Sequence, residues 1–230
     1  MTLIELQERL KLNKVQVEQL QEYAEFLIEY NEKINLTAIT DFEDIVEKHF
    51  YDSLIMTTHK DIKGTLVDVG TGAGFPGVVL KIYYPELKVI LLEPIKKRCI
   101  FLEELINKLK LKDIEVVNIR GEDYVNKHRE EYDYVTARAV TNLNALIEIC
   151  GGLIKIGGYF IALRGRNGIE ELLMAEQAIK KMGFIKEDVY IDELSDSSQR
   201  ITAFLKKQER TNRKFPRKYN IIKSNPLWVK

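Results

Sequence analysis

Residues 66–77, LVDVGTGAGFPG, place four glycines directly after an apolar run that has the pattern of a strand. Gly70, Gly72, Gly74 and Gly77 leave a backbone that a ligand can approach closely, and Asp68 precedes them by two positions. Gly72-x-Gly74-x-x-Gly77 also satisfies the template of dinucleotide-binding turns. The stretch therefore predicts a nucleotide site, although a tight turn that binds nothing has the same letters.

The carboxylate of Asp68 indicates which kind of nucleotide ligand the loop binds. In the pattern Asp68-x-Gly70-x-Gly72-x-Gly74, an anionic side chain lies near the end of the strand. Such a group complements the sulfonium and ammonium charges of S-adenosyl-L-methionine, directly or through water, and is a poor neighbour for a diphosphate. We therefore predict a site for S-adenosyl-L-methionine, and an NAD(P)-dependent oxidoreductase is the alternative.

Three further positions are expected around the same crevice, because ligands of open α/β sheets bind beyond the carboxyl ends of the strands. Glu93 ends the second apolar run and is suited to accept both ribose hydroxyls, although an exposed strand-end residue would look the same. The segment 120–123, RGED, follows the third run and should reach the adenine. Arg138 closes the fourth run at the crevice edge, where a structural salt bridge is an equal alternative.

Alternating strand and helix patterns must position these residues. The expected strands are 66–69, 89–93, 114–118, 132–137 and 159–163, and the helices between and after them are 76–84, 96–110, 142–154 and 169–181. This alternation predicts an α/β, doubly wound, Rossmann-like fold. The runs 184–191 and 200–207 are separated only by a polar loop, so they should add a C-terminal antiparallel hairpin to a mostly parallel seven-stranded sheet.

Helices should precede the sheet. Thr2 with Glu5 and Asn13 with Gln16 have capping-box spacing, and apolar residues recur at helical spacing after Asn13. We predict three parts: an N-terminal helical extension, residues 1–64, packed on the core; a sheet domain, residues 65–207; and a basic C-terminal tail, residues 208–230.

Charge is balanced over the whole chain but not along it. The 35 basic and 35 acidic residues cancel. From Lys206 onward nine basic residues face one acid, Glu209, which gives +8 and leaves −8 on residues 1–205. Such asymmetry suggests a tail that meets nucleic acid or another acidic surface, although a merely solvated tail has the same composition.

Other classes of protein are not indicated. No apolar run approaches the roughly 20 residues of a membrane span, and the amphipathic, acidic N-terminus is not typical of a signal peptide. Cys99 and Cys150 are far apart, without a CxxC pair, and the three histidines are scattered. We therefore expect a cytoplasmic protein with no metal, no membrane association and no obligate protein partner.

The sequence lacks the motifs of several methyl-transfer reactions, and this limits the possible methyl acceptors. Cys99 and Cys150 fall on apolar helix faces, so a cysteine nucleophile for cytosine-C5 transfer is not indicated. The string 225–228, NPLW, almost imitates an adenine-N6 motif but lies in the tail. A nucleophile with a free lone pair, such as guanine N7, needs no base, and positioning supplies most of the catalysis. No catalytic residue is assigned, with Arg138 the one candidate.

Seven segments together resemble the bacterial 16S rRNA guanine-N7 methyltransferase family, formerly called glucose-inhibited division protein B. They are NLTAI (35–39), HFYDSL (49–54), DVGTGAGFPGVVLKI (68–82), LLEPIKKRCIFLEEL (91–105), RGED (120–123), VTARAV (135–140) and RKFPRKYNIIKSNPL (213–227). The glycine loop is generic, whereas HFYDSL and the basic tail are far more specific. The resemblance covers nearly the whole chain.

The resemblance implies a class I S-adenosylmethionine-dependent methyltransferase fold. It also implies 7-methylguanosine as product and 16S rRNA, or the small ribosomal subunit, as partner. The family's donor-binding positions fall on Gly70, Phe75, Gly121, Glu122 and Arg138. A methyltransferase acting on a small molecule or protein, and an RNA-binding protein that has lost activity, remain alternatives.

The resemblance also gives the basic residues a role. We expect RNA contacts from cations of the tail and of the segment after the fifth strand: Arg213, Lys214, Arg217, Lys218, Arg164 and Arg166. Phe215 and Tyr219, interleaved with the tail cations, are candidates for stacking on bases.

Overall fold

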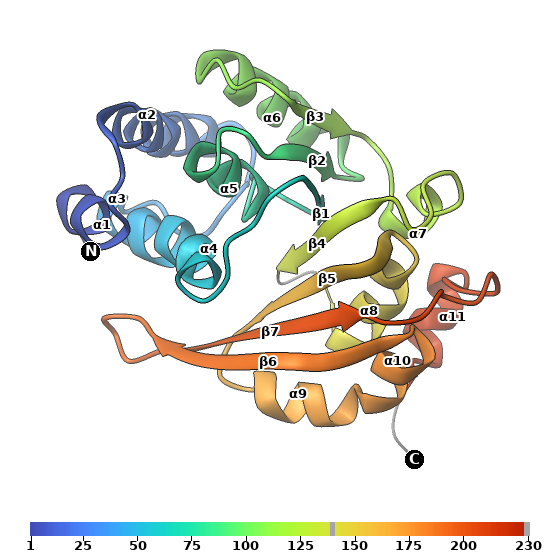
Figure 1. Cartoon of the computed structure of the whole chain (residues 1–230). Helices are drawn as coiled ribbons and strands as arrows, with labels where there is room; N and C mark the ends of the chain where they lie inside the picture. Colours follow the sequence, from blue (N-terminus) through green and yellow to red (C-terminus); the bar gives the residue numbers. More distant parts are fainter. Residues whose placement is uncertain (139–140, 228–230) are drawn as a thin grey trace.

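A seven-stranded sheet forms the centre of the computed structural model, which describes residues 1–138 and 141–227 (Figure 1). Ala139 and Val140 of VTARAV and Trp228 of the tail string lie outside these ranges. The strands are β1 (Thr65–Val69), β2 (Lys88–Leu92), β3 (Ile114–Val117), β4 (Tyr132–Arg138), β5 (Ile154–Arg164), β6 (Phe184–Glu193) and β7 (Gln199–Lys207).

The strand order β3-β2-β1-β4-β5-β7-β6 confirms the predicted doubly wound fold. The first five strands pair in parallel, and β7 pairs antiparallel with both β5 and β6. The chain reverses its direction of winding between β1 and β4, so the crevice expected at such a switch point lies beyond their carboxyl ends. Asp68 of β1 is in register with Thr136 of β4 at this place.

Helices cover both faces of the sheet (Figure 1). On one face lie α1 (Leu3–Leu10), α2 (Lys14–Asn31), α3 (Phe42–Ile45), η1 (Val46–Tyr51), α4 (Asp52–Leu54), η2 (Ile55–Thr58), α5 (Gly77–Tyr83) and α6 (Lys96–Lys108). On the other lie α7 (Gly121–Tyr124), α8 (Leu143–Gly151), α9 (Gly168–Met174), α10 (Glu176–Lys181) and α11 (Tyr219–Ser224). Both predicted capping boxes, at Thr2 and at Asn13, are present.

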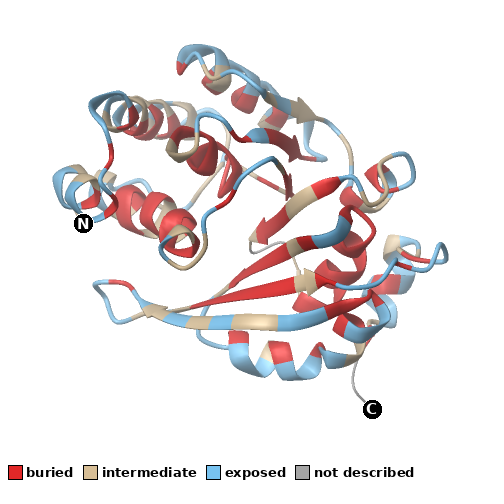
Figure 2. Cartoon of the chain, viewed as in Figure 1, coloured by how far each residue is buried: buried red, intermediate tan, exposed pale blue. Residues whose placement is uncertain are grey.

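Strand alternation divides the core into two layers. Leu66 and Leu91 face the layer of the N-terminal helices, whereas Val67 and Leu92 face the layer of α8. The helices are buried where they meet the sheet and exposed on their outer surfaces (Figure 2). Helices α1 to α4 thus share one apolar layer with the sheet rather than forming a core of their own.

The segment HFYDSL joins this layer to the crevice. It runs through the π-helical turn η1 into α4, where Phe50 and Leu54 are fully buried. His49 and Asp52 are three positions apart, so they lie on one face of the helical segment. The β6–β7 hairpin reaches the same segment, because Ser195 donates from its N–H and its Oγ to Glu47.

The tail is tied to the far layer of helices. Arg217 donates from its backbone N–H and from its guanidinium, at 2.6 to 2.9 Å, to Glu148, which is fully buried in α8. Asn144 donates to the Leu227 carbonyl, and Phe215 is buried in the same layer. Both side chains, which the sequence predicted to contact RNA, help to hold the tail in this structure.

Across the described ranges, none of the helices combines the length and apolar character that a membrane crossing requires.

Candidate active site

A cavity of about 400 Å³ opens at the carboxyl ends of β1 and β2, and we name it the loop cleft. Its wall includes Gly70, Thr71, Gly72, Ala73 and Phe75 of the glycine loop, Glu93 after β2, Arg98 of α6, Leu36, Thr37 and His49 of the N-terminal part, and Arg138 of β4. The structure thus brings together Gly70, Gly72, Phe75, Glu93 and Arg138, five of the predicted donor-binding residues.

The glycines of the loop have different reasons to be glycine. Gly72 has a φ of +63°, and a Cβ built there would meet no atom within 4 Å, so it leaves room in the cleft. Gly74 has a φ of +101°, and its Cβ would lie 2.6 Å from the Tyr23 hydroxyl of α2. Gly74 is absent from the cleft wall and instead allows the N-terminal helices to pack onto the loop. Only the first of the two is placed to serve a ligand.

Asp68 is absent from the wall of the loop cleft, so its predicted contact with the charges of the donor, direct or through water, gains no support from the cleft wall. Its carboxylate is fully buried and accepts hydrogen bonds from the Thr71 and Thr136 hydroxyls and from the Gly77 N–H. Burial raises its pKa to about 6, against the lowering effect of these hydrogen bonds. A strand-end carboxylate that faces the helices rather than solvent thus fixes the loop and the first turn of α5.

Most backbone donors of the loop are already used within the protein. The N–H groups of Gly70 and Thr71 donate to the Leu92 carbonyl, and those of Gly74 and Phe75 donate to the Thr71 carbonyl. The Gly72 N–H donates to Glu93, and the Gly77 N–H donates to Asp68. Dinucleotide-binding turns present such groups to a pyrophosphate at a helix N-terminus. With most of its N–H groups engaged in this way, the loop is less suited to a diphosphate than a dinucleotide-binding turn is.

Glu93 is a second buried carboxylate at the cleft. Its Oε2 accepts from the Gly72 N–H at 3.0 Å and its Oε1 accepts from the Ile95 N–H at 2.9 Å. Each carboxylate oxygen has a further acceptor site, so the side chain is able to receive hydroxyl donors of a ribose as well. Its place in the wall agrees with the predicted ribose contact and excludes the alternative of an exposed strand-end residue.

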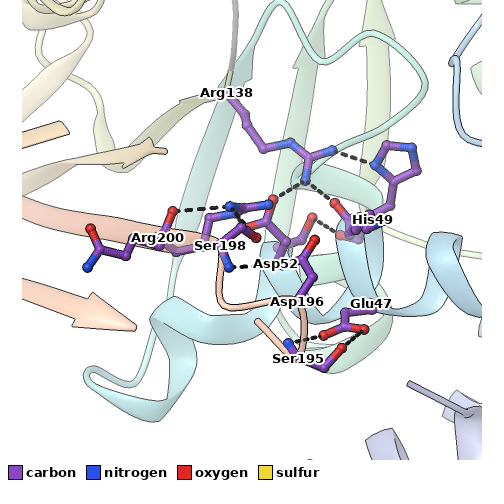
Figure 3. A network of polar contacts seen from close by, with 11 residues as sticks. Glu47, His49, Asp52, Arg138, Ser195, Asp196, Ser198 and Arg200 are labelled. Carbon is purple, nitrogen blue, oxygen red and sulfur yellow. Dashed lines mark hydrogen bonds and ion pairs between the residues drawn. The ribbon is translucent and has the colours of Figure 1, made fainter. Parts of the chain in front are cut away.

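A stacked cation forms the other end of the loop cleft. The His49 ring stacks on Phe75 with centroids 4.3 Å apart, and the Arg138 guanidinium lies 5.0 Å from the Phe75 centroid. Arg138 donates to Asp52 at 3.2 Å and to His49 Nδ1 at 3.2 Å (Figure 3). Of the two alternatives that the sequence left open for Arg138, a salt bridge and a place at the crevice, the structure shows both.

His49 is neutral and cannot serve as a general base. Arginine is only a donor, so Nδ1 of His49 accepts from Arg138, and Nε2 carries the proton and donates to Thr37 Oγ1 at 2.9 Å. Burial, followed by the charge of Arg138, lowers the pKa of His49 to about 3. The ring thus serves to position Arg138 and to cover Phe75.

A second cleft of about 460 Å³ adjoins the first, and His49 and Arg138 belong to both walls. The remainder of its wall includes Lys48, Asp52, Arg164, Glu171 and Arg200. Asp52 accepts from Arg138 with one oxygen and from Arg200 of β7, at 2.7 Å, with the other (Figure 3). Because four cations face two carboxylates, the second cleft is suited to an anionic chain such as RNA.

Other predicted residues lie elsewhere. Gly121 is buried against Val69 and Ile149, and Glu122 lines a third cavity beside Tyr219 of the tail, so neither belongs to the wall of the loop cleft. The prediction that segment 120–123 reaches the adenine gains no support from the cleft wall.

The predicted RNA-binding cations divide by exposure. Arg164 lies in the wall of the second cleft, with its side chain only 12% exposed. Arg166, Arg213, Lys214 and Lys218 are exposed.

Periodicity and loop patterns missed the contributions of His49, Asp52 and Arg200. The first two stand in HFYDSL, a segment that the resemblance marked without assigning roles. Arg200 carried no local signal, since its partner Asp52 is 148 positions away.

No group of three or more His, Cys, Asp or Glu side chains in the described part of the chain is placed to hold a metal ion.

Asp68→Asn tests whether Asp68 acts as a structural acceptor. The amide oxygen can still accept from Gly77, and the Thr136 hydroxyl can turn to accept from the amide. We therefore expect titration calorimetry to give affinities for S-adenosylmethionine and S-adenosylhomocysteine within about threefold of wild type. Asp68→Ala leaves the Gly77 N–H without an acceptor and should cost about 2 kcal/mol of unfolding free energy. A loss confined to the cationic S-adenosylmethionine would show instead that Asp68 acts through its charge.

His49 should make the protein less stable in acid. Its pKa is about 3 in the fold, against 6.5 for an unperturbed histidine, so its contribution to stability is complete above pH 6.5 and is lost as the pH falls. Between pH 7 and pH 5 the wild type should lose about 2 kcal/mol more unfolding free energy than His49→Gln, measured by denaturant titration. Asp68 has a raised pKa, so its contribution to the unfolding free energy increases as the pH falls, equally in wild type and variant. His128→Gln is the control. Equal losses in wild type and variant would refute the assignment.

Comparison with known proteins identifies the family of this chain. The family model described as GidB, rRNA small subunit methyltransferase G, matches residues 16–208. The chain is 42% identical over 222 residues to the ribosomal RNA small subunit methyltransferase G of Staphylococcus epidermidis, covering 95% of this chain and 93% of that protein.

Solved structures agree at the level of the fold. A SAM-dependent methyltransferase from Aquifex aeolicus has a TM-score of 0.55 at 17% identity, covering 77% of this chain and 98% of that one. TYW2 from M. jannaschii, solved in complex with AdoMet, has a TM-score of 0.54 at 15% identity, covering 68% and 76%. From the family match and the identity to its relatives, the chain belongs to the rRNA small subunit methyltransferase G family.

Proposed function

We propose that this chain transfers a methyl group from S-adenosyl-L-methionine to N7 of a guanine in 16S rRNA. Membership of the family supports an rRNA substrate. The observation that carries the proposal is the pair of adjoining clefts that share Arg138, one suited to an adenosyl donor and the other to an anionic chain.

The residues of the loop cleft fit the donor. Glu93 would accept the ribose hydroxyls, and the open space at Gly72 would admit the nucleoside close to the backbone. Phe75 offers an apolar ring, and Arg138 offers a cation to the carboxylate of the methionine part. Because Asp52 balances the charge of Arg138, the site need not repel a sulfonium.

The donor supplies a methyl group bound to a sulfonium. The N7 lone pair forms the new N–C bond, and the electrons of the broken S–C bond remain on sulfur, so the positive charge passes to the guanine ring. No proton is removed in this step. That chemistry agrees with His49, whose ring nitrogens are both engaged and whose pKa is too low for a base at neutral pH. Positioning of the two reactants is then the main task of the protein.

Exposed cations would guide the RNA to the second cleft. Arg166 follows β5 beside this cleft, and the tail presents Arg213, Lys214 and Lys218. Contacts from such side chains to phosphates give affinity and register without reading the sequence. Arg217 is not among them, because Glu148 holds its guanidinium.

The reaction is tested by incubating unmodified small subunits, or their rRNA, with the protein and S-adenosylmethionine. Borohydride reduction and aniline scission cut the RNA chain at 7-methylguanosine. We expect one new cut in the 16S rRNA that depends on the donor. Methyl incorporation without a cut would place the methyl group on another atom, and no incorporation would contradict the proposed function.

The tail is tested by salt dependence. Removing two phosphate contacts with Arg213→Ala and Lys214→Ala should weaken rRNA binding and reduce the slope of log affinity against log salt by about 1 to 2. Lys11→Ala with Lys14→Ala, on the N-terminal helices, is the charge-matched control. If both double variants keep the wild-type slope, the tail does not contact the RNA.

A further inference from the structure

The two carboxylates of the second cleft differ in how many of their oxygens already accept hydrogen bonds from the protein. Asp52 gives one oxygen to Arg138 and the other to Arg200 (Figure 3). Glu171 of α9, in the same wall, has an ion pair with Arg164 at 2.5 Å. The buried Oε2 of Glu171 is the oxygen of this ion pair, and within the described residues no hydrogen bond reaches the other oxygen, Oε1, or leaves the buried Arg164 Nε. The pair therefore has hydrogen-bonding capacity that the protein does not use.

The reaction fixes which edge of a guanine is available for recognition. An arginine fork on N7 and O6 is the commonest way in which proteins read guanine. Here N7 must remain free to face the donor, so that fork is excluded. The Watson–Crick edge remains, and its N1–H and N2 amino group are both donors. A carboxylate with unused acceptor sites is the side chain that complements two adjacent donors.

We infer that Glu171, through the Oε1 that Arg164 does not hold, accepts the N1–H and N2 amino group of the target guanine, and that Arg164 is the positioning residue that orients it. This inference rests on the proposed function and names the residue that selects the acceptor base. Glu171 is the remaining candidate in this wall, since both oxygens of Asp52 are used.

Charge supplies a second reason for a carboxylate here. As N7 takes the methyl group, the guanine ring becomes cationic and its N1–H becomes a stronger donor. A hydrogen bond from N1–H to Glu171 therefore strengthens from the ground state to the transition state, which is the condition for raising kcat. An adenine, which has no N1–H and no N2 amino group, would leave the carboxylate without partners and would be rejected.

Glu171→Gln tests the inference, with Glu170→Gln as matched control, because Glu170 is the exposed neighbour on the same helix. For Glu171→Gln we expect kcat/KM for subunit methylation to fall about 10- to 100-fold, with a loss in kcat. S-Adenosylhomocysteine affinity should stay near wild type, because Glu171 is not in the loop cleft. Glu170→Gln should keep wild-type kinetics, and equal kinetics for the two variants would overturn the inference.

A base substitution separates contact with the guanine from mere support of Arg164. Inosine at the mapped target lacks the N2 amino group but keeps N7, O6 and N1–H. It should lower kcat/KM of the wild type about tenfold or more and lower that of Glu171→Gln much less. Equal methylation of inosine and guanosine by the wild type would overturn the inference even if the variant failed to fold. Failure of the proposed function would be distinct, since wild type would then form no 7-methylguanosine on the natural substrate.

Discussion

The buried carboxylate of Asp68 is the constraint on which the arrangement of the clefts depends. Its hydrogen bonds from Thr71, Gly77 and Thr136 tie the glycine loop, the start of α5 and strand β4 to one point. Burying an anion is costly unless it is hydrogen-bonded, so these three elements are held together by that requirement. The same contacts use the Gly77 N–H at the start of α5, a donor of the kind that a diphosphate would need.

Arg138 connects this fixed loop to the second cleft, and under the proposed function it lies between the two reactants. It ends β4 and lines both clefts, with Asp52 and His49 from the N-terminal part holding its guanidinium. Arg200 brings the distant β7 to Asp52, and Tyr23 donates to the carbonyl of Ala73 in the loop. The N-terminal helices and the C-terminal hairpin are therefore walls of the site rather than additions to the sheet domain.

The sequence predicted the fold well, because strand and helix periodicities are local properties. The runs around 66–69 and 159–163 became β1 and β5 of the predicted parallel sheet, and the polar loop after residue 191 joins the predicted hairpin. The directions of individual side chains were harder to predict from the sequence. Asp68 points under the loop, and Arg217 points to a glutamate 69 positions away, because partners distant in the chain decide both. No local pattern could have paired Arg200 with Asp52.

A crystal structure with bound S-adenosylhomocysteine would show whether the donor lies in the loop cleft with its sulfur facing the second cleft across Arg138. We expect the ribose hydroxyls on Glu93 and the thioether sulfur beside Phe75, on the side that opens toward Arg138. A ligand bound in the third cavity beside Tyr219, or a sulfur turned away from the second cleft, would contradict this expectation.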